Sequence, residues 1–409
     1  MKDIFDFKLI SKKNLTLKFI LLFLLSAVAL SCSVSFIVTP FNPEECCCDH
    51  LFYRSMAFNL FKVERPEYNV IPKENPLKDL YKTEYFSRYF DFRNALNRQP
   101  PYVYRILSPF IARAIGWLFF GDDISTGFYT LTFISIIFTI FFIGITLYLL
   151  NDSILLSFLG QIFCLLLWIF RFLLYDYMLT DPLNVLFISL TLFFMLKDKK
   201  PLIYLIFLLG LFNKEVFGFI IISYLLFRFL QKELKISEIF IISFIIIVYL
   251  LFRTFMPVPV NKFTFKNIFW GMNFYRIVSI YLNSFGILFF FTLTRMWFSS
   301  FTISLLPLGL GGIFTTIFAS DHQRIIEYTN FNLVIFSVLG IKLKNKNLYN
   351  LIPILIFLIF KIIKKYLVMK NFVIFYAQFI IFIIIESFLL HYYFKVKNKK
   401  FISLKKELT

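Results

Sequence analysis

The chain has 409 residues, of which 59% are hydrophobic and only 16% are charged. Soluble domains are about half apolar and about a quarter charged, so this composition excludes an ordinary soluble protein. The formal net charge is +19, yet the sequence carries no nucleic-acid-binding motif, and cytoplasmic lysine clusters of a membrane protein account for the charge. Several apolar runs approach the roughly 20 residues that cross a bilayer as a helix. Because backbone groups in lipid must bond internally, we expect an all-α integral membrane protein.

Taken in chain order, the apolar runs predict about 12 transmembrane helices in a single polytopic domain covering residues 1–409. The first run extends from Leu17 to Val38. That length favours an uncleaved spanning helix over a signal peptide ending at Cys32. The further runs are 127–150, 154–174, 183–196, 201–213, 216–230, 236–252, 277–294, 297–318, 328–341, 348–363 and 371–394.

Lysines and arginines divide the predicted loops into two sides. Loops rich in these residues remain in the cytoplasm. The cytoplasmic set consists of the N-terminal tail, the loops 197–200, 231–235 and 342–347, and the basic tail 395–409. The opposite loops carry less positive charge, except for the segment 253–276 and the lysines between 361 and 370, so the last two helices are the hardest to orient.

By this assignment, residues 39–125 form the first extracytoplasmic loop. A loop of this length without structure is uncommon, so we expect it to be structured. Within it, residues 102–120 are apolar and place Arg105 and Arg113 eight residues apart, on nearly one helix face. This spacing predicts an interfacial helix with its arginines directed to water or to lipid headgroups.

Ionisable residues beside the apolar runs gather on the outer side of this topology. Charges at membrane depth are costly and usually face a cavity or a charged partner. Chance would scatter them over both sides, so their common location indicates a functional site. These residues are Asp49, Arg105, Asp176, Asp181, Lys214, Glu215, Asp321 and Arg324.

Local structure offers a second explanation for several of these residues. Asp181 precedes a proline and suits the start of a helix. Lys214 and Glu215 are adjacent and cannot share a helix face, so each needs its own partner unless both mark a turn. Asp321 and Arg324 stand three residues apart and could form a local ion pair.

Group transfer from a lipid-anchored phosphate would use such a set of residues. The lipid tail of the donor lies in the bilayer, so the enzyme must be a membrane protein. Arg and Lys bind a leaving phosphate through charge-assisted hydrogen bonds. A carboxylate can act as general base toward the hydroxyl of the acceptor, and in an inverting transfer the leaving group departs from the opposite face of the sugar.

Five short motifs follow one another between residue 17 and about residue 340. They are Asp49-His-Leu-Phe-Tyr53, YRILSPFIAR (104–113), Thr180-Asp181-Pro182, Asn213-Lys214-Glu215 and Asp321-His-Gln-Arg324. In this order they resemble the GT-C superfamily of polytopic membrane glycosyltransferases. Members of that superfamily use polyprenyl-phosphate-linked sugars and act on the outer face of the membrane.

The resemblance implies an inverting glycosyltransferase of the hexosyltransferase type in the bacterial inner (cytoplasmic) membrane, with an extracytoplasmic active site. Asp49 would be the catalytic base. Arg105, Lys214 and Arg324 would contact phosphate or substrate, and Asp181 would be an orienting or second acidic residue. Glu215, Asp321 and Tyr53 complete the expected substrate site. The expected partners are a polyprenyl-phosphate-linked sugar donor, a glycan, lipid or protein acceptor, and membrane lipids, with no nucleic acid.

The sequence departs from the superfamily pattern in two ways. The first loop has no second acidic residue directly beside Asp49, whose nearest acids are Glu44 and Glu45, and a lysine-rich tail stands where a large soluble C-terminal domain is expected. The class of acceptor therefore stays open. No cofactor is assigned, and a divalent metal stays open as well.

Three rival functions account for some of the same residues. A zinc enzyme could use Cys46–Cys48 with His50 and His322, although three consecutive cysteines fit one ion poorly. A transporter would also place charges in a membrane cavity, but it should show inverted repeats, which the sequence lacks. An O-antigen-type polymerase or ligase would share lipid-linked donors, but its large outer loop normally comes late in the chain.

Overall fold

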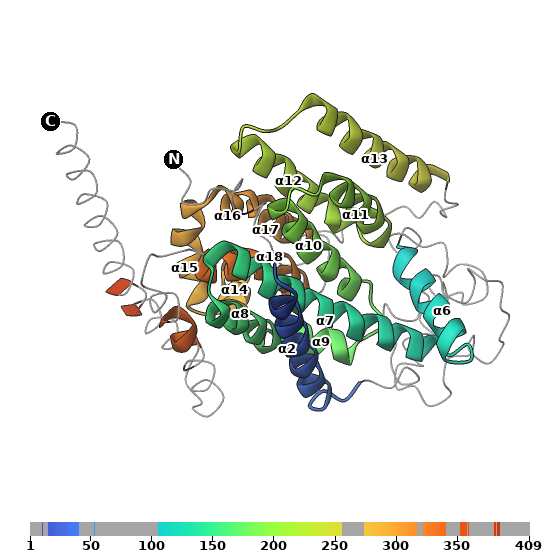
Figure 1. Cartoon of the computed structure of the whole chain (residues 1–409), viewed down its shortest axis with the longest axis horizontal. Coiled ribbons are helices and arrows are strands. Elements are labelled where there is room, and N and C mark those ends of the chain that lie inside the picture. Colours follow the sequence, from blue (N-terminus) through green and yellow to red (C-terminus); the bar gives the residue numbers. More distant parts are fainter. Residues whose placement is uncertain are drawn as a thin grey trace.

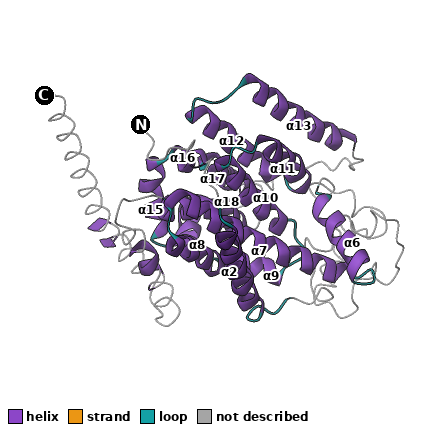
Figure 2. Ribbon diagram, in the orientation of Figure 1, coloured by secondary structure: helices purple, strands orange, loops and turns teal. Residues whose placement is uncertain are grey.

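The computed structural model describes residues 10, 15–40, 53, 105–255, 274–316, 322–340, 352–357, 359, 380–381 and 383–384. This part of the chain is helical and contains no strand (Figure 2), so the all-α prediction is confirmed within it. Three helices are long and apolar enough to cross a membrane, and the number rises to five if each of two bent helix pairs forms one span.

Fourteen α-helices and two short 3-10 helices lie between residues 17 and 339 of the described ranges, and residues 352–357 are helical as well. Several of the α-helices are shorter than a full membrane span because they end at turns or bends. They are α2 (Leu17–Ser35), α6 (Leu107–Phe119), α7 (Ile124–Asn151), α8 (Ile154–Leu166), α9 (Trp168–Tyr175), α10 (Asp181–Leu196), α11 (Lys200–Asn213), η4 (Glu215–Phe217), α12 (Gly218–Leu230), α13 (Ile236–Phe255), α14 (Phe274–Phe285), α15 (Leu288–Arg295), η6 (Met296–Phe298), α16 (Ser300–Ser304), α17 (Leu306–Thr316) and α18 (His322–Leu339).

Helix α7 is the longest of these helices and packs against α2, α6, α8 and α10 (Figure 1). It begins where the Asp123 carboxylate accepts hydrogen bonds from the backbone N–H groups of Ser125 and Thr126, at 2.9 and 3.2 Å. This is a side-chain N-cap. The helix ends at Asp152, which adopts the left-handed conformation with φ 59°. Because α7 is apolar nearly all round and mostly buried, it forms the scaffold against which the other helices pack.

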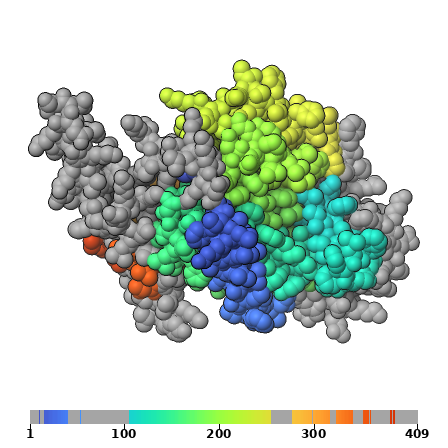
Figure 3. Space-filling model, viewed as in Figure 1, coloured from blue at the N-terminus to red at the C-terminus, as the bar shows by residue number. Residues whose placement is uncertain are grey.

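A buried glutamine joins α2, α7 and α8. The Nε2 of Gln161 donates to the carbonyl oxygens of Phe23, at 3.1 Å, and Ile140, at 3.3 Å, and Ser26 Oγ donates to its Oε1. Polar side chains that bond across helices hold membrane bundles together where no hydrophobic force acts between helices and lipid. Gln161 therefore fixes α2, which lies on the surface of the bundle (Figure 3).

The helix pair α8 and α9 bends by 55° at Leu167. The bend frees backbone groups at the start of α9, and one of them is the N–H of Ile169. Glu327 of α18 is fully buried and accepts a hydrogen bond from this N–H at 2.7 Å. The other carboxylate oxygen of Glu327 accepts from Gln323 Nε2 at 2.9 Å. This carboxylate replaces the helical partner that the bend removes.

Helix α13 lies along one edge of the bundle (Figure 1) and shows the two faces expected of a membrane span in contact with lipid. Ile245 and Tyr249 are buried, whereas Phe240, Phe244 and Leu251 are exposed. Exposed apolar side chains over the length of a span fit a lipid-facing surface, which is compatible with an integral membrane protein.

The predicted interfacial segment forms α6, but the predicted direction of its arginines is wrong. Arg113 is buried and forms an ion pair with Asp122, and the residue Arg105 pairs with Glu215 across the bundle. The side chains that α6 exposes are apolar, such as Trp117. Each arginine has an acidic partner within the fold. The two arginines therefore form ion pairs inside the protein and are not directed to water or to lipid headgroups.

Candidate functional site

Five chain segments meet at one end of the bundle: the residues before α6, the start of α10, the end of α11, η4 and the start of α18. Helix α10 begins at the Asp181-Pro182 pair. Helix α11 ends at Asn213 because Lys214 leaves the helical region, with φ −162° and ψ 135°, and η4 then starts at Glu215. As expected for adjacent residues at a helix break, Lys214 and Glu215 have different partners.

A buried ion pair between Lys214 and Asp181 lies at the centre of the site. Lys214 Nζ donates to Asp181 Oδ1, and the Nε of Arg324 lies 3.6 Å from the other carboxylate oxygen. The Lys214 ammonium also lies 4.8 Å from the centroid of the Tyr328 ring. Burial lowers the pKa of Lys214 to about 8, and the Asp181 charge opposes this shift. Asp181 thus holds two cations from two different segments of the chain.

Arg105 makes a second pair beside the first. Its Nε donates to Glu215 Oε2 at 3.0 Å, and one of its terminal nitrogens donates to the hydroxyl of Tyr53 at 2.9 Å. The planar guanidinium can make both bonds at once because its donors point in fixed, divergent directions. Through this contact the first loop, in which Tyr53 lies, is attached to the break between α11 and η4.

Asn213 connects the segments that carry the two pairs. Its side-chain oxygen accepts from Ser108 Oγ at 2.6 Å, and its Nδ2 donates to the carbonyl oxygen of Thr180 at 2.8 Å. Asn213 is fully buried. The Asn213 amide thus joins the ends of α6, α10 and α11. This contact positions the charged residues that stand next to those helix ends.

Three cationic groups and two carboxylates meet in this place among the described residues. They are the guanidinium groups of Arg105 and Arg324, the ammonium of Lys214, and the carboxylates of Asp181 and Glu215. Arginine and lysine side chains bind phosphate through charge-assisted hydrogen bonds. The cluster therefore offers the chemistry that recognition of a phosphate group would use.

The structure brings together six of the residues that the sequence singled out, namely Tyr53, Arg105, Asp181, Lys214, Glu215 and Arg324. Asp176 ends α9 as its C-cap. Asp49 and Asp321 lie outside the described residues, so the predicted local pair of Asp321 with Arg324 stays a prediction. Within the described residues, Arg324 lies beside the carboxylate of Asp181.

Sequence reasoning missed three residues that contact the site. Tyr328 lies under Lys214, Phe172 of α9 places its ring 5.7 Å from the Arg324 guanidinium, and Ser108 bonds the Asn213 side chain. Tyr328 follows Arg324 by four residues, so helical periodicity could have found it. Ser108 stands three residues after Arg105, within the quoted segment 104–113, and Phe172 stands four residues before Asp176, so the same spacing could have pointed to both.

Metal ligation has no support in the described part of the chain. Within these ranges, no group of three His, Cys, Asp or Glu side chains is placed to hold a metal ion. The cysteines Cys46–Cys48 and His50 lie outside them. The zinc alternative therefore stays a hypothesis about residues that the structure does not describe.

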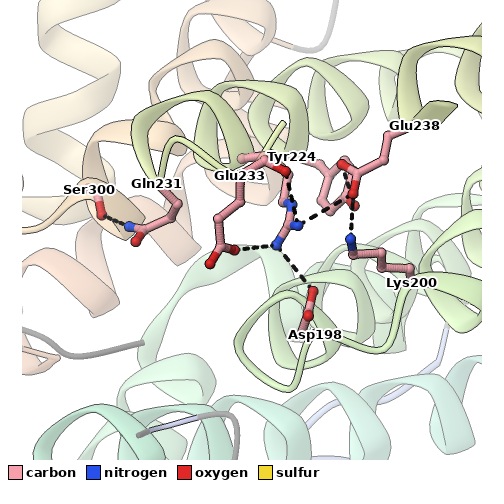
Figure 4. A network of polar contacts seen from close by, with 8 residues as sticks. Asp198, Lys200, Tyr224, Gln231, Glu233, Glu238 and Ser300 are labelled. Atoms are coloured by element: carbon pink, nitrogen blue, oxygen red, sulfur yellow. Dashed lines mark hydrogen bonds and ion pairs between the residues drawn. The ribbon is translucent and has the colours of Figure 1, made fainter. Parts of the chain in front are cut away.

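A second polar network lies at the other end of α10, α11 and α12 (Figure 4). The guanidinium of Arg228 donates to Asp198 at 3.1 Å, to Glu233 at 2.9 Å and to Glu238 at 3.3 Å. Glu238 also accepts from Lys200. The loops 197–200 and 231–235, which positive charge assigned to one side of the membrane, thus lie together, opposite the Lys214–Asp181 pair.

Comparison of the chain with protein-family models, with curated proteins and with solved structures finds no match. The resemblance to the GT-C superfamily therefore stays a hypothesis carried by the motifs. The geometry of the charged residues, and the chemistry that it allows, are the independent guide to function.

Proposed function

We propose that this chain is a membrane glycosyltransferase that moves a sugar from a polyprenyl-phosphate-linked donor to an acceptor on the extracytoplasmic face. In this proposal it is a polytopic protein of about 12 transmembrane helices in the bacterial inner membrane. The acceptor is a glycan, a lipid or a protein. The motifs that resemble the GT-C superfamily support this assignment, and the geometry at Lys214 supports it independently.

The observation that carries the proposal is the meeting of Arg105, Lys214 and Arg324 around the carboxylates of Asp181 and Glu215. These three cations come from three segments far apart in sequence. Charged groups at membrane depth are costly and usually face a cavity or a charged partner. A leaving phosphate would be such a partner at the moment when its negative charge develops, which is where fixed cations contribute most to catalysis.

The depth of this cluster supports a lipid-linked donor. Helix α10 has 16 residues and α11 has 14, so they span about 24 and 21 Å at 1.5 Å per residue. The hydrocarbon core of a bilayer is about 30 Å thick. With one end of these helices at the basic cytoplasmic loops, the cluster at the other end would lie about 6 to 9 Å inside the outer boundary of the hydrocarbon core, where a donor with its lipid tail in the bilayer could approach it.

The proposed reaction is the inverting displacement that the resemblance implies. The Asp49 carboxylate takes the proton of the acceptor hydroxyl, whose oxygen attacks the anomeric carbon. The bond from that carbon to the phosphate oxygen breaks, and the lipid phosphate leaves with the electron pair. Arg105, Lys214 and Arg324 bind the charge that develops on the phosphate.

Replacement of the proposed base tests this function. Cells that lack the gene should lose one sugar from their glycolipids or surface polysaccharide, and a gene with Asp49→Asn should fail to restore it at equal membrane level. Glu45→Gln is the matched control, because it removes an acid from the same loop and should restore the sugar fully. The measurement is a glycolipid and polysaccharide profile by mass spectrometry.

Two results would contradict the proposal. A normal profile with Asp49→Asn would show that this carboxylate is not the base. An unchanged profile without the gene, together with loss of uptake of a solute, would favour the transporter that the charged residues also allow.

A further inference from the structure

Helix α9 has only eight residues, yet it is linked to two members of the charged site. It ends just before the turn that leads to Asp181 at the start of α10, and its Phe172 ring lies 5.7 Å from the Arg324 guanidinium. A helix of about two turns is not stable by itself, so its position depends on contacts with the rest of the bundle. The contacts that fix α9 therefore also fix the surroundings of these two charged residues.

The contacts between α9 and α18 follow a common register. The backbone N–H of Ile169 donates to the Glu327 carboxylate at 2.7 Å. One turn further along α9, the Phe172 ring lies over Arg324, which precedes Glu327 by one turn in α18. Residues three apart on a helix share a face, so the Glu327 bond and the Arg324 contact belong to one packed interface.

This interface depends on Glu327 at the start of α9. The 55° bend at Leu167 leaves the N–H groups in the first turn of α9 without helical partners. Glu327 and Ile169 are both 0% exposed, so bulk water does not reach this bond. Loss of the carboxylate would leave a buried donor unsatisfied, and the start of α9 would move until it found another acceptor.

We propose that Glu327 is a positioning residue of the site: it holds α9 so that Phe172 keeps the Arg324 guanidinium within the charged cluster. In this role Glu327 does not touch the donor. Its second carboxylate oxygen accepts from Gln323, and the whole side chain is buried. This inference rests on the proposed function, because it is there that Arg324 binds the phosphate of the lipid-linked donor.

The test measures the binding of farnesyl phosphate, a short polyprenyl phosphate, to the full-length protein in lipid nanodiscs by calorimetry. Farnesol, which lacks the phosphate, measures the contribution of the lipid chain. Arg324→Ala and Glu327→Leu should each weaken the binding of farnesyl phosphate on the order of tenfold. Phe172→Leu removes only the ring contact and should weaken it about two- to fivefold. The affinity for farnesol should be the same in all variants.

Three comparisons separate positioning from a general loss of structure. In the Arg324→Ala background, Glu327→Leu should cause no further loss of affinity, because its effect passes through that guanidinium. Glu327→Gln keeps an oxygen that accepts from Ile169 and should restore the wild-type affinity. Gln161→Leu removes another fully buried side chain that bonds across helices, and it should lower thermal stability without changing the affinity for farnesyl phosphate.

A second variant keeps the inference testable if Glu327→Leu does not fold. Phe172→Leu replaces one apolar side chain with another, and its effect on affinity should also vanish in the Arg324→Ala background. A loss that persists in that background would overturn the inference, whichever of the two variants shows it. So would a Glu327→Gln variant that binds as weakly as Glu327→Leu, because Glu327 would then act through its charge.

The outcomes also separate this inference from the proposed function. If Arg324→Ala weakens the binding of farnesyl phosphate while Glu327→Leu binds it as the wild type does, the phosphate site stands and the positioning role is wrong. If the wild type binds farnesyl phosphate no more tightly than farnesol, the phosphate site is absent, and the proposed function and this inference fail together.

Discussion

At the scale of single residues, the central feature is a lysine and an aspartate that are both buried and depend on each other. The side chains of Lys214 and Asp181 are 6% and 2% exposed. Removing one member of a buried pair leaves a charge without compensation, which typically costs about 3 to 5 kcal/mol. Arg324 lies 3.6 Å from the same carboxylate and shares it, so the two partners are not equivalent.

This asymmetry predicts different effects for the two single replacements. Asp181→Asn removes the carboxylate charge that both Lys214 and Arg324 contact and should lower the free energy of unfolding by about 3 to 5 kcal/mol. Lys214→Met leaves Asp181 with Arg324 and should cost less. The double variant should be more stable than the sum of the single effects predicts. Thermal unfolding of the purified protein in detergent measures this, and strictly additive effects would contradict the coupling.

At the scale of elements, α13 depends on polar contacts at its start for its attachment to α12 and to the turn before α11. Glu238 is in the first turn of α13, is 3% exposed, and accepts hydrogen bonds from Lys200 and from Arg228 at the end of α12 (Figure 4). The rest of α13 exposes much of its apolar surface. Its position therefore rests on this carboxylate and on the few aromatic contacts of Phe212 with Tyr249 and Phe252.

Two carboxylates on the same arginine provide a matched comparison. Glu238→Gln removes a buried charge that serves both Lys200 and Arg228, so it should lower the free energy of unfolding by about 3 kcal/mol. Glu233→Gln removes another acidic partner of Arg228. The Glu233 side chain is 39% exposed, so solvent screening should keep the loss in the free energy of unfolding below about 1 kcal/mol. Equal midpoints of thermal unfolding for the two variants would contradict this account of α13.

At the scale of the whole molecule, the helix ends are sorted into two groups by their polar contacts. Asn151 at the end of α7 donates to the carbonyl oxygen of Leu339 at the end of α18, at 3.0 Å. Gln231, after α12, donates to Ser300 at the start of α16. The candidate site lies at the opposite ends of these helices. This alternation agrees with the order of the apolar runs, in which successive runs are expected to cross in opposite directions, while α8 and α9 belong to one run and bend by 55°.

The sorting predicts which loops can be reached from outside the cell. In a functional background without native cysteines, Phe120→Cys in the turn before α7 should react with a membrane-impermeant maleimide in intact cells. Asp198→Cys, at the opposite end of the bundle, should react only after permeabilisation. Both side chains are exposed in the structure, Phe120 at 41% and Asp198 at 50%. A cysteine that fails to react would therefore lie on the side of the membrane that the reagent does not reach. Reversed labelling would invert the topology and place the site in the cytoplasm.

Much of this organisation was readable from the sequence. Apolar runs predicted helices because lipid leaves the backbone no other partner, and the described helices overlap the runs from Leu17 to about residue 340. Charged residues beside those runs named the members of the site, because a charge at membrane depth needs a partner. Lys214 and Glu215 were expected to have separate partners, and they do.

The tertiary structure decided which of these residues meet. Sequence spacing did not reveal that Lys214 pairs with Asp181 or that Arg105 pairs with Glu215, because each pair joins helix ends separated by tens of residues or more. Local propensity fixes where a helix begins and ends, whereas the packing of one helix on another fixes which charged side chains form ion pairs.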